Sequence, residues 1–402
     1  MSLLVKEARV VTQAPGVGAR RGPSMGELLV HPATDVRVEG GCIVAVGRGL
    51  PADGAEEVIE ARGRVLLPGF VDCHTHACWT GDRLDEWERK RRGVPYLEIL
   101  AGGGGILATV RAVRSATGEA LAAELRGRLD RLLAGGTTTV EVKSGYGLST
   151  DAELKLLRAI REASIDWPGS VVPTALLGHA KDPSIDDFVE LTVRETLPAV
   201  TREFPRAAVD AYCEEGSWST SECVRLLAAA TAAGHPVRVH ADQFHALGMT
   251  REAVRLGAVS VDHLEASSKD DLEFLAASRT LGVILPVTGF HTDGRFANGR
   301  ALIDAGGAVA LATNWNPGTA PSGSMPFAIA LAVRQCGLTP AEAITASTLN
   351  AAAVLGLSDR GVIAPGARAD LVLLHHRDER MLAYEVGSDP VAAVVCGGMR
   401  VK

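Results

Sequence analysis

Two histidines separated by a single threonine, His74 and His76, follow an apolar run that is typical of a buried strand. Alternate side chains of an extended chain point to the same face, so we expect both imidazoles to face the same way. Neutral imidazole is a common metal ligand in proteins. The spacing therefore predicts a metal site at the end of this strand.

Two further histidines, His240 and His263, follow later apolar runs, and asparagines follow the last of these runs. A catalytic zinc-like ion takes three or four nitrogen or oxygen ligands and keeps a position open for water. A single histidine is more often a structural residue, whereas four at separate strand ends favour a metal. Histidines without this placement are interpreted as structural: His31, His235, His245, His291, His375 and His376.

The elements that must position these histidines are short β-rich runs, which alternate with helical segments. Eight runs are expected as strands, over residues 65–72, 137–143, 171–178, 207–213, 236–241, 258–263, 282–288 and 308–313. Their number and spacing match a (β/α)₈ barrel, which would gather the polar residues after its strands at one face. A doubly wound open sheet is the alternative.

Helical spacing is clearest in residues 148–163, where Thr150 precedes Glu153 by three positions, as in a capping box. Residues 186–200 and 339–356 are also expected to be helical.

The two ends of the chain differ from its middle. Residues 1–62 and 366–402 contain short alternating runs punctuated by glycine, which are typical of strands. We therefore predict that both ends combine into one small β-sandwich domain beside a barrel domain of residues 63–365.

The composition of the 402-residue chain indicates a globular protein with a small-molecule ligand. Its net charge of −7 argues against nucleic acid or an anionic membrane as a partner, because both favour a basic face. Lys6 and Glu7 interrupt the N-terminal apolar run, and seven scattered cysteines fit reduced thiols. We therefore expect a cytoplasmic protein.

Several motifs carry a resemblance to a known family. The chain resembles the amidohydrolase superfamily in PGFVDCHTH, HADQF, VDHLE and ATNWNPG. The resemblance narrows, through GGGI, EVKSGYGLSTDAELKLL and NPGTAPSGSM, to the branch that hydrolyses 4-imidazolone-5-propanoate to N-formimidoyl-glutamate in histidine breakdown. It implies a metal-dependent barrel hydrolase with one zinc or iron ion (Zn²⁺ or Fe²⁺/³⁺) per chain, assembled as a homodimer.

The resemblance also implies roles for individual residues. The implied metal ligands are His74, His76, His240 and Asn314, and the catalytic residues are His263 and Gln243. The implied substrate contacts are Arg83, Tyr146, His179, Gln243, Asn316, Gly318 and Thr319. Arg83 is suited to the propionate, because a planar guanidinium binds a carboxylate at two points. Alternatively, Arg83 is simply one of several charged, solvent-exposed residues in the segment 81–92.

Asn314 departs from the superfamily pattern, which has aspartate at this position. An aspartate would ligate the metal and accept a proton, whereas asparagine offers a neutral carbonyl oxygen and cannot act as that base. His263 is then expected to accept the proton. Two other hypotheses are a non-catalytic protein that binds a related ligand, and a hydrolase of another cyclic amide or amidine.

Overall fold

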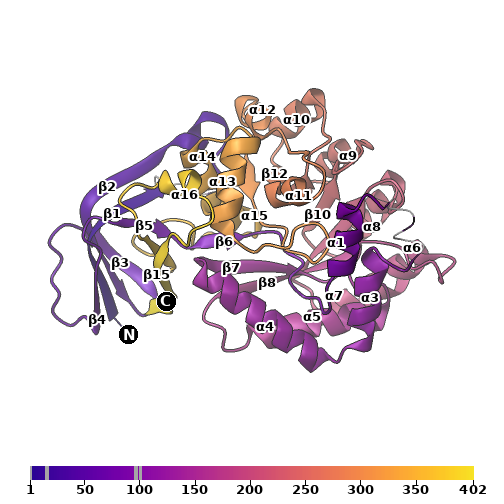
Figure 1. The fold of residues 1–402 in the computed structure, drawn as a ribbon, viewed down its shortest axis with the longest axis horizontal. Helices are drawn as coiled ribbons and strands as arrows, with labels where there is room; N and C mark the ends of the chain where they lie inside the picture. The colour runs from indigo at the N-terminus through magenta and orange to yellow at the C-terminus, as the bar shows by residue number, and fades with distance from the viewer. Residues whose placement is uncertain (1, 14–17, 95–97, 99–101) are drawn as a thin grey trace.

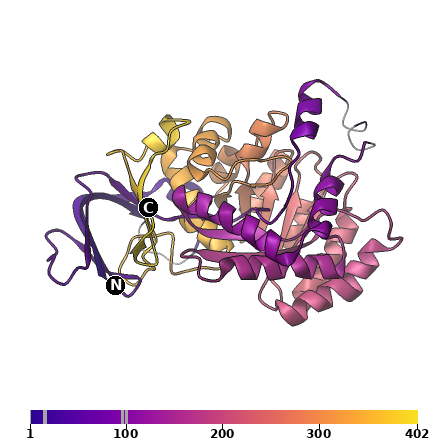
Figure 2. The same ribbon diagram turned by 60° about the horizontal axis from the view of Figure 1, so that its bottom comes forward.

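The structure is a computed structural model that describes residues 2–13, 18–94, 98 and 102–402. A barrel of alternating strands and helices lies beside a sheet built from both ends of the chain (Figure 1). In the turned view the indigo and yellow strands, which come from the two ends, again lie next to each other (Figure 2).

Eight parallel strands form the barrel and are hydrogen-bonded in their chain order. They are β6 (Phe70–Asp72), β7 (Thr137–Lys143), β8 (Ser170–Gly178), β9 (Ala208–Cys213), β10 (Val237–Ala241), β11 (Ser260–His263), β12 (Leu281–Ile284) and β13 (Val309–Leu311). Just past β6 and β13 the two edges meet, because the Asn314 N–H donates to the His74 carbonyl at 3.0 Å and the His76 N–H to the Trp315 carbonyl at 3.0 Å. The predicted (β/α)₈ barrel is confirmed.

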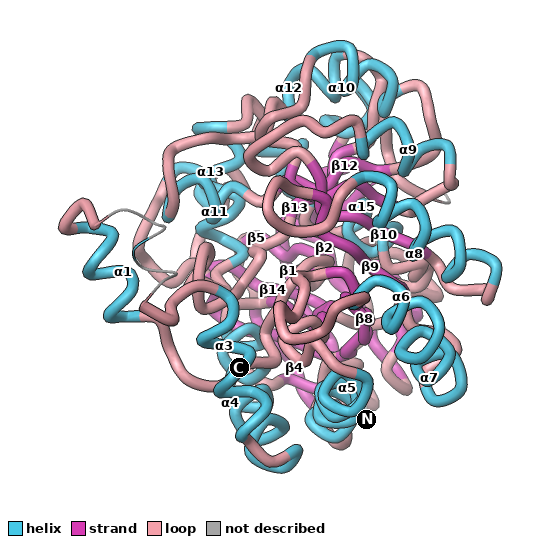
Figure 3. The backbone as a smooth tube through the Cα atoms, turned by 90° about the vertical axis from the view of Figure 1, so that its right-hand side faces the viewer, coloured by secondary structure: helices cyan, strands magenta, loops and turns pink. Residues whose placement is uncertain are grey.

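Helices connect these strands and surround them on the outside (Figure 3). They are α1 (Leu84–Arg91), α3 (Ile106–Ser115), α4 (Gly118–Ala134), α5 (Thr150–Ser164), α6 (Phe188–Leu191), the π-helical turn η2 (Thr192–Thr196), α7 (Leu197–Glu203), α8 (Thr220–Ala232), α9 (Met249–Arg255), α10 (Lys269–Ala276), α11 (Pro286–His291), α12 (Gly299–Asp304), α13 (Met325–Gln335), α14 (Pro340–Ala346) and α15 (Leu349–Val354). Within the described residues, no helix has both the length and the apolar character that a membrane crossing requires.

The second sheet combines both ends of the chain, in the order β16-β15-β14-β5-β1-β2-β3, with β4 beside β1. Its strands are β1 (Ser2–Gln13), β2 (Leu28–Glu39), β3 (Cys42–Gly47), β4 (Glu57–Glu60), β5 (Val65–Pro68), β14 (Leu371–Leu374), β15 (Val391–Cys396) and β16 (Met399–Arg400), accompanied by η1 (Gly22–Gly26) and α16 (Met381–Tyr384). Buried residues from both ends, such as Val10 and Leu373, share one apolar core there.

The predicted strand over residues 65–72 is divided between the two sheets. Its first half, β5, pairs with β1 and β14 of the terminal sheet, and its second half, β6, opens the barrel. Gly69 lies at the crossing, where a Cβ atom would come within 2.3 Å of the Thr138 hydroxyl. Only glycine fits this close approach, so the chain passes from one sheet to the other without a loop.

The predicted capping box at the start of α5 does not form. The N-cap is Ser149, one residue before Thr150, and its hydroxyl accepts a hydrogen bond from the first turn. Glu153 instead turns its carboxylate toward the preceding loop, where it accepts from the N–H groups of Gly145 at 2.8 Å and Gly147 at 2.7 Å. This buried carboxylate therefore holds the loop between β7 and α5.

Candidate metal centre and active site

Three buried imidazoles converge at the C-terminal ends of the barrel strands. They belong to His74 after β6, His240 in β10 and His263 at the end of β11, and their ligating nitrogens lie within 4.8 Å of one another. His76 is next to them, with its Nε2 atom 3.2 Å from Nε2 of His240. The structure thus brings together all four strand-end histidines that the sequence singles out.

The donor atoms of this cluster fit a bound metal ion. Within the described residues, His74 Nε2 and Asn314 Oδ1 are buried without a hydrogen-bond partner. A buried polar atom left unsatisfied costs about 1–3 kcal/mol, which a coordinated cation would offset. Tetrahedral zinc ligands at the usual Zn–N length lie about 3.3 Å apart, close to the separation of the His76 and His240 nitrogens. Nitrogen and oxygen donors of this kind suit zinc or iron.

Buried carboxylates fix the orientation of two of these imidazoles. Nδ1 of His74 lies 2.6 Å from Asp262, and Nδ1 of His240 lies 3.1 Å from Asp210. A proton held on Nδ1 leaves the Nε2 lone pair directed into the cluster. Burial lowers the pKa of both histidines, so both rings are neutral at pH 7, as metal ligation requires.

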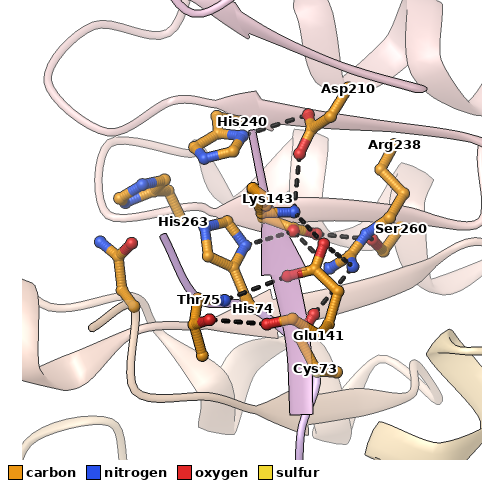
Figure 4. A network of polar contacts seen from close by, with 12 residues as sticks. Cys73, His74, Thr75, Glu141, Lys143, Asp210, Arg238, His240, Ser260 and His263 are labelled. Carbon is orange, nitrogen blue, oxygen red and sulfur yellow. Dashed lines mark hydrogen bonds and ion pairs between the residues drawn. The ribbon is translucent and has the colours of Figure 1, made fainter. Parts of the chain in front are cut away.

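A buried ion-pair network holds those carboxylates (Figure 4). The Arg238 guanidinium lies 2.6 Å from Asp262 and 3.2 Å from Glu141, and the Lys143 ammonium lies 2.8 Å from Asp210 and 2.7 Å from Glu141. Although burial opposes charge on Asp210, His240 and Lys143 hold the pKa of this carboxyl well below its usual range. Three carboxylates and two cations leave one net negative charge, which favours a cation in the adjacent cluster.

Strand register assembles the network. Arg238 and His240 are two residues apart in β10 and therefore share a face, while Asp262 of β11 lies opposite His240. Asp210 of β9 lies opposite Arg238. Sequence patterns did not single out Asp210 or Asp262, although charged residues that alternate with apolar ones in these strands were a usable signal.

Arg83 lies against the loop that follows β13. A Cβ atom on Gly318 would come within 2.3 Å of Arg83 Nη1, so the guanidinium and this glycine are in direct contact. Glu86 accepts from Nε at 2.8 Å and also binds Nη2, which leaves Nη1 at the loop. Although burial opposes its charge, hydrogen bonds from Arg83 and Lys90 lower the pKa of Glu86 to about 2.

Two predicted substrate residues line the same region as the histidine cluster. The ring of His179 stacks on that of His76 with centroids 5.0 Å apart, and its Nδ1 lies 3.0 Å from the Gly145 carbonyl. Tyr146 approaches His179 with ring centroids 5.2 Å apart. Burial lowers the pKa of His179 to about 3 and raises that of Tyr146, so both side chains are neutral.

The remaining predicted residues lie in the loops after β10 and β13. The side-chain oxygen of Asn316 (Oδ1) accepts hydrogen bonds from the N–H groups of Gly318 at 2.8 Å and Thr319 at 2.7 Å. Its side-chain nitrogen (Nδ2) donates to the backbone carbonyl of Asn314 at 2.7 Å. These bonds give Asn316 a loop-forming role, and its contact with substrate stays a prediction. Gln243 is buried three residues beyond His240.

Two further residues support the cluster and were not assigned roles from sequence. Thr288 accepts a hydrogen bond from the Asn314 side-chain amide at 2.8 Å, which directs the Asn314 carbonyl oxygen away from it. Glu265 lies 3.2 Å from Nδ1 of His263. The Thr288 contact joins residues 26 positions apart, so no single sequence window contains it, whereas Glu265 lies two residues after His263 in VDHLE and this spacing was a usable local signal.

Unusual backbone conformations mark three of the strand ends. Asp242, His263 and Asn314 have φ values of 57°, 90° and 55°, in the region that residues other than glycine rarely adopt. Such conformations persist where the surrounding structure enforces them, and they concentrate at functional sites. Their position beside the histidine cluster supports a functional role for this face.

Comparison with known proteins agrees with the fold and this site. The profile of the Amidohydrolase family matches residues 65–401. The chain therefore belongs to the amidohydrolase family, whose members are metal-dependent.

Its relatives include an imidazolonepropionase from Deinococcus radiodurans, 46% identical over 387 residues, which are 96% of each chain. An imidazolonepropionase from Herpetosiphon aurantiacus is 44% identical over 100% of this chain and 97% of its own. Among solved structures, atrazine chlorohydrolase TrzN from Arthrobacter aurescens TC1 complexed with zinc has the same fold, with a TM-score of 0.74, 18% identity, and coverage of 99% of this chain and 95% of its own.

The ion-pair network predicts a large stability effect at Arg238. Arg238→Met should lower the free energy of unfolding by about 3–5 kcal/mol, because Asp262 would stay buried without its cation and Glu141 would keep only Lys143. Urea denaturation would measure this change.

The matched control is Arg158→Met, which removes an exposed ion pair with Glu203 and should change stability by less than about 1 kcal/mol. Equal losses in the two variants would contradict the role assigned to the network.

Proposed function

We propose that this chain is an imidazolonepropionase, a hydrolase that acts on the carbon–nitrogen bond of a cyclic amide. Water adds across the ring amide of 4-imidazolone-5-propanoate, and the product is N-formimidoyl-L-glutamate. The observation that carries the proposal is the 46% identity to the Deinococcus radiodurans imidazolonepropionase over 96% of both chains. The clustered histidines and Arg83 supply groups suited to the amide and to the propionate of this substrate.

We propose that His74, His76, His240 and Asn314 hold one zinc or iron ion. When bound, such an ion would polarise the substrate carbonyl and lower the pKa of a bound water toward about 7. Neutral imidazoles and the unpartnered Asn314 oxygen are suitable donors.

His263 is the residue proposed to move the proton. Asn314 is neutral and cannot accept one, whereas His263 is buried at the cluster with Nδ1 engaged by Glu265. Its Nε2 atom is therefore the free basic nitrogen, which takes a proton from the attacking water and returns it to the leaving ring nitrogen. Gln243 contributes a hydrogen bond to the substrate ring, but its side-chain amide cannot take up or release a proton.

Arg83 is proposed to bind the propionate of the substrate. Its Nη1 atom faces the Gly318 loop while Glu86 holds the other donors, so the guanidinium is oriented before substrate arrives. The rings of Tyr146 and His179 pack beside that of His76, which suits them to contact the substrate ring. A homodimer is a further proposal that rests on the family resemblance. A cytoplasmic location is another, and it rests on the scattered cysteines and the charged N-terminal run.

The test of the proposed function is turnover of freshly prepared 4-imidazolone-5-propanoate by the purified protein, with bound metal counted on the same sample. We expect loss of substrate absorbance and about one metal ion per chain, and removal of the metal by a chelator should abolish turnover. Metal-loaded protein without turnover would reject this function.

Asn314 favours a second candidate, a non-catalytic protein that binds a related cyclic amide. The loss of a carboxylate at a metal site removes both a charged ligand and a base. If the parent protein binds substrate without turnover and Asn314→Asp creates activity, this second candidate is correct.

Arg83→Ala should mainly raise KM. The variant removes a charge-assisted hydrogen bond to the propionate, worth about 1.5–3 kcal/mol, so we expect an increase of about 10- to 100-fold. Steady-state kinetics would measure it, with Arg92→Ala as the control, because Arg92 forms an exposed ion pair with Glu88 in the same region. An unchanged KM would remove Arg83 from the substrate site.

A further inference from the structure

Each of the three converging imidazoles has a carboxylate beside its Nδ1 atom. Glu265, the carboxylate beside His263, differs from the other two in its surroundings. Asp262 and Asp210, which bind His74 and His240, are each paired with a buried cation. Glu265 binds Nδ1 of His263 at 3.2 Å. In the part of the chain that the structure describes, no lysine or arginine forms an ion pair with Glu265.

Glu265 also has, within the described part of the chain, a carboxylate oxygen without a hydrogen bond. Its side chain is 4% exposed, and its Oε2 atom is buried without a hydrogen-bond partner among the described residues. A buried carboxylate in this state is stabilised most by a partner that donates a proton or carries positive charge. His263 is that partner, so the two residues form a buried pair whose negative charge is uncompensated while the ring is neutral.

We propose that Glu265 is a positioning residue that keeps the His263 proton on Nδ1 and stabilises the positive charge that His263 gains when Nε2 accepts a proton. This inference rests on the proposed function, and it assigns to the His263–Glu265 pair the negative charge that Asn314 does not supply. A carboxylate at Nδ1 plays this double role in hydrolases that use histidine as a base, where it fixes the tautomer and stabilises the imidazolium.

The backbone supports this arrangement. His263 and Leu264 have consecutive positive φ values of 90° and 72°, and this turn lies directly between β11 and Glu265. The Leu264 N–H is bound to the Ala241 carbonyl at 3.2 Å, which fixes the turn to β10. These two residues turn the chain out of the strand direction, so that the Glu265 carboxylate lies against the ring of His263.

The first test is kinetic. Glu265→Gln retains the side-chain shape and removes the charge, so kcat should fall at least about 100-fold while KM and metal content stay unchanged. The matched control is Glu215→Gln, because Glu215 also faces a histidine, His245, at 3.6 Å but is 63% exposed. The control should retain parental kcat, and a similar loss in both variants would overturn the proposal.

A double-mutant cycle separates the proposed role from a merely structural one. If Glu265 offsets the neutral Asn314, then Glu265→Gln should cost at least about tenfold less in kcat when it is combined with Asn314→Asp than when it is made alone. An equal loss in both backgrounds would reject the compensating role.

The third test needs neither metal nor substrate. Nitrogen NMR of the metal-free protein, labelled at its histidine rings, would report which nitrogen of His263 carries the proton, with the signals assigned by comparison with His263→Asn. We expect the proton on Nδ1 in the parent and a shift toward Nε2 in Glu265→Gln.

A proton on Nε2 in the parent would overturn the proposal, even if the Glu265→Gln variant failed to fold. The proton position is independent of the substrate, so a protein without turnover but with the Nδ1 proton would reject the proposed function and leave only the tautomer-fixing role of Glu265 intact.

Discussion

The site depends on the buried ion pairs between β7, β9, β10 and β11. Ionised carboxylates inside a barrel cost several kcal/mol each in lost hydration, and they remain there because Lys143 and Arg238 lie within hydrogen-bond distance. Those carboxylates in turn decide which nitrogen of His74 and His240 carries a proton. The orientation of these two imidazoles is therefore set by the strands before any ligand binds.

The same device, a buried carboxylate that accepts several hydrogen bonds, organises the loops around the site. Glu153 holds the loop that carries Tyr146, through the N–H groups of Gly145 and Gly147. Glu86 holds the Arg83 guanidinium and also accepts from the Gly105 N–H at 2.8 Å. Glu153 and Glu86 thus fix the loop segments that they bind, which reduces the entropy that ligand binding must overcome.

Sequence alone predicted the barrel and the residues at its strand ends, because period-two patterns and strand-end histidines are local signals. It did not predict the supporting contacts, because these join distant parts of the chain. Asp262 lies 188 positions from His74, and Asp210 lies 30 positions from His240. The division of residues 65–72 between two sheets was missed for a similar reason. The close contact that requires Gly69 comes from Thr138, on a neighbouring strand.

If Asn314 is a metal ligand, as proposed, its replacement of aspartate changes the charge of the site without changing its shape. Its φ of 55° is tolerated by asparagine and aspartate alike. The Thr288 hydroxyl accepts from the asparagine amide here, and the same hydroxyl can rotate to donate to a carboxylate. Either side chain therefore presents one oxygen to the cluster in the same position. Asparagine and aspartate differ in negative charge and in the capacity to accept a proton. Among the described residues, Glu265 is a buried carboxylate at this cluster that no lysine or arginine neutralises. Under the proposed function, the exchange transfers the proton-accepting role across the site, from the end of β13 to the end of β11.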